Sequence, residues 1–261
     1  MGDEKRKSQL QKLVSPFILR RTKKQVLKDL PDKVEKDMWL YLANLAQVNE
    51  QLQQQLELEK VDSILILAMM TRLRQICCEP RMLYENYKGE STKFSMCLDL
   101  IETLKENGKK VLLFSSFTSI FDDFIEEFDR RGIKYHMITG AVDKKKRKEE
   151  VDAFQNDDSN VFLISLKAGG TGLNLTKAQA VIHFDPWWNV SAQNQATDRA
   201  YRIGQTKNVL VYQLLMKNTI EEKIYEMQKR KKEMSDLFVE NSNGGISTLS
   251  KEELKDLFSM D

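Results

Sequence analysis

The sequence predicts an α/β domain with a parallel sheet flanked by helices over residues 91–240, preceded by a helical segment. After residue 91, short continuous apolar stretches alternate with amphipathic helical stretches, which is typical of βαβ units. Up to about residue 80, the apolar spacing is helical throughout. The 261 residues include 41% apolar side chains, which is enough to bury a core and excludes a chain that is disordered throughout.

The helical segment has two parts. One apolar stripe is formed by residues three or four positions apart: Leu45, Val48, Leu52 and Leu56. Residues 63–78 continue the helical pattern, and Glu79-Pro80 stops it, because the residue before a proline avoids helical backbone angles. We therefore expect the chain to be helical up to about residue 80.

The α/β part is predicted to contain five strands and five helices. The strands are the short apolar stretches 110–114, 135–138, 161–165, 180–184 and 209–214. The helices are the amphipathic stretches 92–107, 120–131, 144–154, 190–202 and 219–239. Gly108 and Gly132 close the first two helices, as glycine commonly does.

Composition excludes several classes of protein. The longest apolar run, at residues 63–70, is far shorter than the roughly 18 residues of a membrane span, and the polar start lacks a secretory signal. Three cysteines and two histidines give neither a disulfide framework nor metal-ligand spacing. We expect a soluble intracellular protein with reduced thiols and no membrane association, in the cytoplasm or nucleoid of a bacterium or the nucleus of a eukaryote.

Charge is segregated although the net charge is only +2. Residues 1–36 carry 11 lysines and arginines against 5 acidic residues, so this opening segment could face phosphates or an acidic partner. A solvated helix or a flexible tail would have the same composition, and charge alone does not decide between them. The basic run 144–148 could be a nuclear-import or nucleic-acid patch, but a solvated helix face is favoured.

A glycine-rich stretch, SLKAGGTGLN at residues 165–174, directly follows a predicted buried strand. Ligands of α/β proteins bind at the carboxyl ends of the strands, and glycines let a backbone come close to a phosphate or ribose. Thr171 and Asn174 add side chains that can form hydrogen bonds. The stretch is neither a GxGxxG nor a GxxxxGK[ST] motif, and a simple chain reversal would also account for it.

The stretch QATDRAYRIGQ, at residues 195–205, is the second candidate. On a helix, Gln195, Arg199 and Arg202 would project from one face, because residues three and four apart are neighbours. Convergent guanidinium groups suit a phosphoryl group in transfer. Spacing alone favours an ordinary exposed helix with surface ion pairs, such as Asp198 with Arg202.

Four stretches together resemble one known family. KVLLFSSFT (110–118), the glycine-rich loop (165–175), DPWWN (185–189) and QATDRAYRIGQ occur in the order of motifs IV, V and VI of SWI/SNF-type (Snf family) DNA translocases of helicase superfamily 2. FILRRTKKQVLKDLPDKVE (17–35) is similar to the segment that leads into the second lobe of those proteins. The resemblance covers roughly residues 15–240.

The resemblance implies that the chain is the second, C-terminal RecA-like lobe of a two-lobed motor. ATP would be bound with Mg²⁺ between the lobes, and the phosphate-binding loop and the acidic Mg²⁺ box would belong to the first lobe. Neither motif occurs in this sequence. We therefore expect this chain alone to be inactive and to complete an ATPase together with the first lobe of its parent chain.

Roles carry over residue by residue onto the matching positions. The resemblance makes Arg199 and Arg202 arginine fingers for the γ-phosphate, while Gln195 helps to place the attacking water or the phosphate. Gly172 and Asn174 match positions beside the nucleotide ribose. Four residues match positions near the backbone of duplex DNA, which the family binds without regard to base sequence: Ser115, Ser165, Lys167 and Thr171. Asp185 and Trp188 match elements of the lobe interface, although a buried tryptophan in the core is an equal interpretation.

These expectations divide the chain into four parts: a basic opening segment (1–36), a helical protrusion-like segment open to protein partners (37–90), the RecA-like lobe (91–240), and a polar tail with a short helix (241–261). The predicted function is that of the C-terminal helicase lobe of an ATP-dependent translocase on duplex DNA. The alternative is a non-catalytic DNA- or protein-binding module that has kept the fold.

Overall fold

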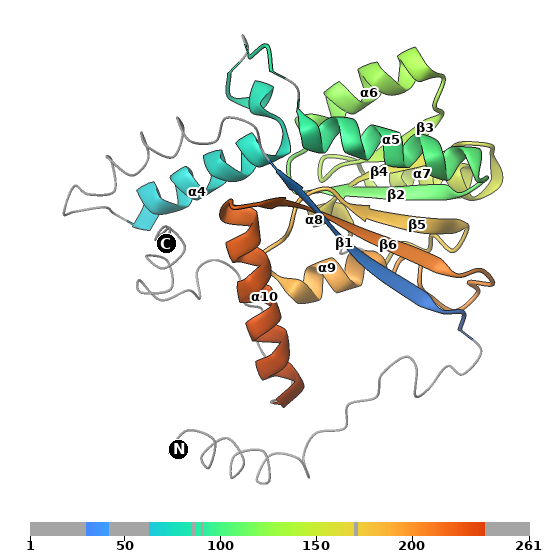
Figure 1. The fold of residues 1–261 in the computed structure, drawn as a ribbon. Coiled ribbons are helices and arrows are strands. Elements are labelled where there is room, and N and C mark those ends of the chain that lie inside the picture. The colour runs from blue at the N-terminus through green and yellow to red at the C-terminus, as the bar shows by residue number, and fades with distance from the viewer. Residues whose placement is uncertain (1–29, 42–62, 85–86, 90, 170–171, 238–261) are drawn as a thin grey trace.

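The computed structural model describes residues 30–41, 63–84, 87–89, 91–169 and 172–237 (Figure 1). Six strands form one parallel sheet in the order β1-β6-β5-β2-β4-β3. The strands are β1 (Lys33–Tyr41), β2 (Lys110–Ser115), β3 (Tyr135–Ile138), β4 (Val161–Ser165), β5 (Ala178–His183) and β6 (Val209–Lys217). The helices are α4 (Ser63–Cys78), η2 (Pro80–Met82), α5 (Thr92–Glu106), α6 (Ile120–Arg131), α7 (Lys144–Asn156), α8 (Leu166–Gly169), α9 (Val190–Thr197) and α10 (Ile220–Leu237). The predicted parallel α/β fold is confirmed.

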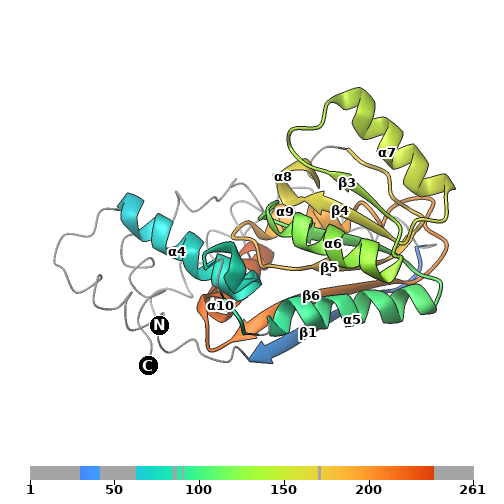
Figure 2. The same cartoon turned by 90° about the horizontal axis from the view of Figure 1, so that it is seen from above.

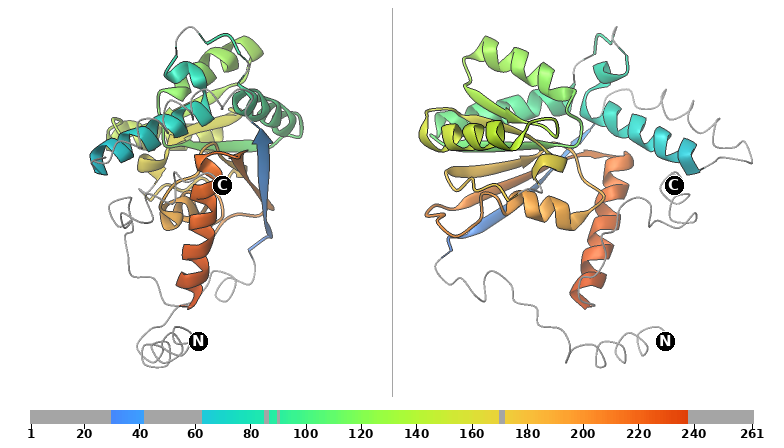
Figure 3. Two further views of the ribbon diagram at one scale, coloured as in Figure 1. Left: turned by 60° about the vertical axis from the view of Figure 1, so that its left-hand side comes forward. Right: turned by 180° about the vertical axis from the view of Figure 1, so that it is seen from behind.

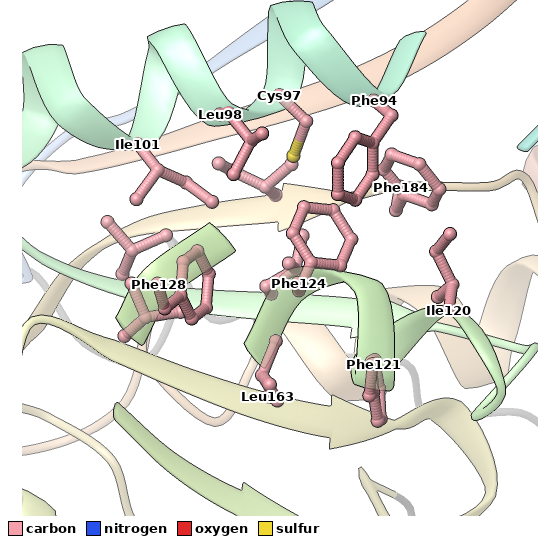
Figure 4. Packing of buried hydrophobic residues seen from close by; sticks show 14 of the residues in the cluster. Phe94, Cys97, Leu98, Ile101, Ile120, Phe121, Phe124, Phe128, Leu163 and Phe184 are labelled. Atoms are coloured by element: carbon pink, nitrogen blue, oxygen red, sulfur yellow. The ribbon is translucent and has the colours of Figure 1, made fainter. Parts of the chain in front are cut away.

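The central strands are apolar throughout because both faces of the sheet are covered. Along β2, Val111 and Leu113 pack into a cluster with α5 and α6, while Leu112 and Phe114 pack into a second cluster on the other face. Figure 4 shows the first cluster, where Phe124 and Phe128 of α6 meet the apolar side of α5. The views from the front and from behind show α6 and α9 on opposite sides of the sheet (Figures 1 and 3).

A third cluster lies at the carboxyl ends of β1 and β6 and joins α4 to α10. Its buried members are Leu40, Met70, Leu73, Cys77, Trp188, Met216, Ile220 and Ile224. Beside it, Lys93 Nζ donates to both carboxylate oxygens of Glu221 at 2.6 and 2.7 Å, and both side chains are fully buried. Burial opposes a charge on Lys93, but the Glu221 carboxylate outweighs burial and raises the pKa of Lys93 above its ordinary value. The pair fixes the start of α10 against the start of α5.

The expectation of helix up to residue 80 is wrong at Lys33–Tyr41, which is a strand. This strand, β1, pairs with β6 over nine positions, from Lys33 opposite Val209 to Tyr41 opposite Lys217. It is the edge strand, and it exposes the side chains of Val34 and Trp39. The helical segment thus begins after a strand of the sheet. The apolar stripe predicted at residues 45–56 lies outside the described residues.

The loops between elements follow from local chemistry. Gly132 ends α6 in the left-handed conformation, with φ 61°, as its position in the sequence predicts. The carboxylate of Asp143 accepts from the backbone N–H groups of Lys145 and Lys146, which caps α7. The lysines of the run 144–148 are exposed, in agreement with the favoured interpretation of a solvated helix face.

Candidate functional site

The candidate site lies where neighbouring parallel strands end. β5, β2 and β4 are adjacent, so their carboxyl ends bring together the chain after His183, the chain after Ser115 and the glycine-rich loop after Ser165. Figure 2 shows α4, α8 and α10 on the same side as the arrowheads of the strands. This edge is where ligands of parallel α/β sheets bind.

Ser115 lies at the end of β2 and is fully buried. Its hydroxyl donates to Asp185 Oδ1 at 2.7 Å, and the Ser116 backbone N–H donates to the same oxygen at 2.9 Å. The expectation that Ser115 contacts the DNA backbone does not fit this placement, because the hydroxyl is turned into the protein toward a carboxylate. The Ser116 hydroxyl also donates to the other carboxylate oxygen, Asp185 Oδ2.

Arg74 of α4 completes this network, and sequence reasoning assigned it no role. Its guanidinium donates to Asp185 Oδ2 at 2.8 Å and to Ser116 Oγ at 2.8 Å, and its side chain is 5% exposed. Three aromatic rings surround the guanidinium carbon at 4.9 to 5.6 Å: Phe117, Trp187 and Trp188. Asp185 and Trp188 are thus buried, which favours the core interpretation of Trp188 over a place on the lobe surface.

The glycine-rich loop begins as the short helix α8. Ser165 Oγ accepts from the Ala168 backbone N–H at 3.3 Å, so this buried hydroxyl caps α8, while Lys167 is exposed. A Cβ atom on Gly169 would lie 3.0 Å from Phe114 Cε1, so glycine is needed there for packing rather than for a ligand. Gly172 and Asn174 are exposed, with open space beside the Gly172 Cα. Thr171 lies outside the described residues.

The prediction that a helix runs to residue 202 is wrong, because α9 ends at Thr197. The backbone then tightens: the N–H groups of Arg199 and Ala200 donate three residues back, to Ala196 and Thr197. We call residues 198–204 the arginine turn. Gln195 therefore lies on α9, where its side chain is exposed, and the two arginines lie on the turn rather than on the same helical face.

The arginine turn is held against the glycine-rich loop. Arg199 Nε donates to the Gly169 carbonyl at 2.8 Å, and the Arg199 carbonyl accepts from the Leu175 N–H at 3.0 Å. Arg202 is exposed and places Nη1 3.5 Å from the Leu173 carbonyl. Burial and the nearby Arg202 charge lower the pKa of Arg199. The structure thus brings the arginine turn, with Arg199 and Arg202, beside the loop that contains Gly172 and Asn174.

His183 anchors the start of the arginine turn. Its Nε2 lies 2.8 Å from Thr197 Oγ1, and its ring stacks on Phe114 with a centroid distance of 5.6 Å. Burial lowers the pKa of His183 to about 4, so the ring is neutral at pH 7. His183 is therefore a residue of the core that supports the arginine turn.

Comparisons with known proteins match both halves of the chain. Residues 92–204 match the family described as helicase conserved C-terminal domain, and residues 1–82 match the SNF2-related domain. An uncharacterized ATP-dependent helicase of Mycoplasma pneumoniae is 41% identical over 95% of this chain and 25% of its own length. The putative ATP-dependent helicase/translocase YwqA of Bacillus subtilis is 37% identical over 99% of this chain and 30% of its own length.

A solved structure agrees with the sequence matches. The Sulfolobus solfataricus SWI2/SNF2 ATPase core, solved in complex with double-stranded DNA, superimposes with a TM-score of 0.71 at 32% identity, over 97% of this chain and 56% of that one. The chain belongs to the SNF2 family of helicases, as a C-terminal lobe. The resemblance and the RecA-like fold predicted from the sequence are both confirmed. The lobe spans about a quarter of the length of the curated SNF2 relatives it matches.

Two further properties concern the part of the lobe that the structure describes. Within those residues, no helix is long and apolar enough to cross a membrane. The same residues contain no group of three or more His, Cys, Asp or Glu side chains placed to hold a metal ion.

Proposed function

We propose that this SNF2 lobe completes an ATP-dependent translocase on duplex DNA by presenting Arg199 and Arg202 to a nucleotide held by a first RecA-like lobe. The observation that carries the proposal is the arginine turn: it places an exposed Arg202 and a half-buried Arg199 beside the glycine-rich loop. Among the described residues, Arg202 has no carboxylate partner and only the 3.5 Å contact with the Leu173 carbonyl.

The residues present suit the phosphate end of ATP. An exposed guanidinium without a carboxylate partner in the described chain is ready to bind an anion. ATP would supply the γ-phosphoryl group whose transfer to water drives the motor. Arg199 and Arg202 would neutralise the negative charge on that group, Gln195 would help to place the attacking water, and Gly172 and Asn174 would border the ribose. The proposal assigns the Mg²⁺ ligands to the first lobe.

An exposed apolar side chain supports docking of a first lobe beside the two arginines. Ile203, directly after Arg202, is 70% exposed, more than the other large apolar side chains exposed in the described part of the chain. Isoleucine on a tight turn beside an arginine would be covered when a partner surface closes on the nucleotide. Ile203 would then join Arg202 in contact with the first lobe.

The lobe would bind DNA through its phosphates rather than through its bases. The Sulfolobus structure with double-stranded DNA makes duplex DNA the expected substrate. Lys167, exposed on α8 at the carboxyl edge, is the side chain of this group best placed to meet a phosphate. Ser165 and Ser115 are buried, so they would support the loops that bind DNA, and the role of Thr171 stays a prediction.

Hydrolysis of ATP by the parent chain that includes the upstream lobe tests this proposal, with and without duplex DNA. Replacement of Arg202 or Arg199 by alanine should lower turnover by roughly 10³–10⁵-fold, as loss of an arginine finger does. Arg130→Ala, an exposed arginine on α6, is the matched control and should hydrolyse ATP at the wild-type rate. This lobe alone should be inactive.

Three outcomes would contradict the proposal in different ways. If Arg202→Ala and wild type hydrolyse ATP equally fast, the arginine assignment is wrong. If DNA does not stimulate the parent chain, the lobe is better described as a binding module that has kept the fold. Activity of the lobe alone would mean that the phosphates bind elsewhere.

A further inference from the structure

A buried amide sits directly behind the arginine turn. Gln205 is 5% exposed, and its Nε2 donates to the carbonyl of Ala178 at 2.9 Å and to that of Ala200 at 3.2 Å. Its Oε1 accepts from the Lys207 backbone N–H at 2.9 Å. Both amide protons and the carbonyl oxygen are therefore used, which leaves the side chain a single orientation.

These three bonds connect the turn to two strands of the sheet. Ala178 is the first residue of β5, Ala200 lies within the arginine turn, and Lys207 lies two residues before β6. Gln205 also donates its own backbone N–H to the Arg202 carbonyl at 3.0 Å, and Gly204 takes φ 98°, which favours glycine. The path of the backbone at Arg202 is thus set by Gln205 and Gly204.

The side chain of Arg202 does little to hold itself in place. It is exposed, and the one hydrogen bond that its guanidinium donates to a described residue is 3.5 Å long. The position of the guanidinium therefore depends on the backbone that carries it. A displacement of about 1 Å at a reacting centre can cost roughly 100-fold in rate.

We propose that Gln205 is a positioning residue that fixes Arg202 for catalysis by tying the arginine turn to β5 and to the start of β6. This inference rests on the proposed function of Arg202. Gln205 does not touch the nucleotide in this scheme. It acts through the backbone of residues 200–205, so its loss should affect turnover rather than binding.

Two replacements test this role in the parent chain with both lobes. Gln205→Glu keeps the size of the side chain but removes both protons that the Ala178 and Ala200 carbonyls accept, and Gln205→Leu removes all three bonds. Each should lower kcat for ATP by about 10- to 100-fold, in line with a shift near 1 Å. The KM for ATP and the affinity for duplex DNA should stay within twofold of wild type.

Gln179, which follows Ala178 on β5, provides a matched control. It is also buried, at 9% exposure, its Nε2 donates to the Lys177 carbonyl at 2.7 Å, and its Oε1 accepts from the Lys110 N–H at 3.0 Å. It has no bond to the arginine turn. Gln179→Leu should therefore lose buried hydrogen bonds at the start of β5 and yet keep the wild-type kcat. A comparable loss of kcat in this control would overturn the proposal.

A double variant separates positioning from a general structural role. In the Arg202→Ala background, Gln205→Leu should lower kcat by less than twofold further, because there is no longer a guanidinium to position. An undiminished 10- to 100-fold drop in that background would show that Gln205 supports the fold instead. Failure of both Gln205 variants to fold, where Gln179→Leu folds, would lead to the same conclusion.

The outcomes also separate this inference from the function on which it rests. If Arg202→Ala is inactive while both Gln205 variants turn over like wild type, only the positioning role is wrong. If Arg202→Ala keeps wild-type turnover, the proposed function fails, and the inference fails with it.

Discussion

The Arg74 guanidinium donates to Asp185 Oδ2 at 2.8 Å, and the two residues are 111 positions apart in the chain. Both side chains are buried, at 5% and 0% exposure. The same carboxylate accepts from Ser115, the last residue of β2, and from Ser116, which follows it. One ion pair therefore joins α4 to the ends of two adjacent strands, so that α4 is a fixed part of the lobe.

We expect Arg74→Met to destabilise the lobe by about 3 kcal/mol, because it leaves a buried carboxylate without its counter-charge. The measurement is urea unfolding of the chain. Arg130→Ala, which breaks an exposed pair with Glu127, should cause no measurable loss. Adding Asp185→Asn to Arg74→Met should recover part of the stability, and an additive double variant would show that the two groups are not coupled.

We expect acid to weaken the lobe through His183. Its pKa is about 4 in the folded chain and about 6.5 in an unfolded one, so between these values only the unfolded chain takes up the proton. The free energy of unfolding should thus fall as pH falls below 6.5, by about 2–3 kcal/mol at pH 4.5. His183→Gln can keep the bond to Thr197 without titrating and should show a smaller fall. If the free energy of unfolding falls equally in the wild type and in His183→Gln, the His183 ring is not neutral and buried as described.

We expect Gly169→Ala to lower stability by about 1–2 kcal/mol, because its new methyl group would press on the Phe114 ring at 3.0 Å. Gly140→Ala is the control, since nothing lies within 4 Å of a Cβ atom there. Thermal unfolding of the two variants decides the matter. If the two variants unfold at the same temperature, Phe114 has room to move, and the glycine is not required for packing.

We expect Lys167→Ala to weaken DNA binding by the parent chain in a salt-dependent way. One lost phosphate contact should reduce the slope of log affinity against log salt by about 0.9. Lys177→Ala removes the same charge at an exposed position at the opposite end of the strands and should leave the slope unchanged. Titration of a labelled duplex at several salt concentrations distinguishes the two. Equal slopes for Lys167→Ala and wild type would remove α8 from the DNA interface.

The central strands and most helices could be predicted because their patterns are local. β3, β4, α4 and α6 begin and end at the residues that periodicity indicates. β1 could not, because an edge strand exposes much of its surface, and EKDMWLY mixes charged and apolar residues without the continuous apolar run of a buried strand. Pairing with β6, more than 160 residues away, determines its structure.

Part of the candidate site could also be predicted from local sequence patterns. The glycine-rich loop could be placed at the carboxyl edge of the sheet, because it directly follows a buried strand. QATDRAYR suits a longer helix, but the chain bends after Thr197, where Ala200 accepts a hydrogen bond from Gln205 and Arg199 donates one to the Gly169 carbonyl. Arg74 and Gln205 each bind a partner distant in sequence, Asp185 and Ala178 respectively, which spacing within a motif does not reveal.

The place of β1 in the sheet affects how the lobe can be produced for experiments. A recombinant chain that starts near residue 91, where the helicase C-terminal match begins, would lack β1. β6 would then become the edge, with nine backbone positions open to pairing with another chain. Such exposed edges promote aggregation. Expression boundaries for this lobe should therefore be set ahead of Lys33, because a shorter version would lose both the edge strand and the Arg74 partner of the buried Asp185.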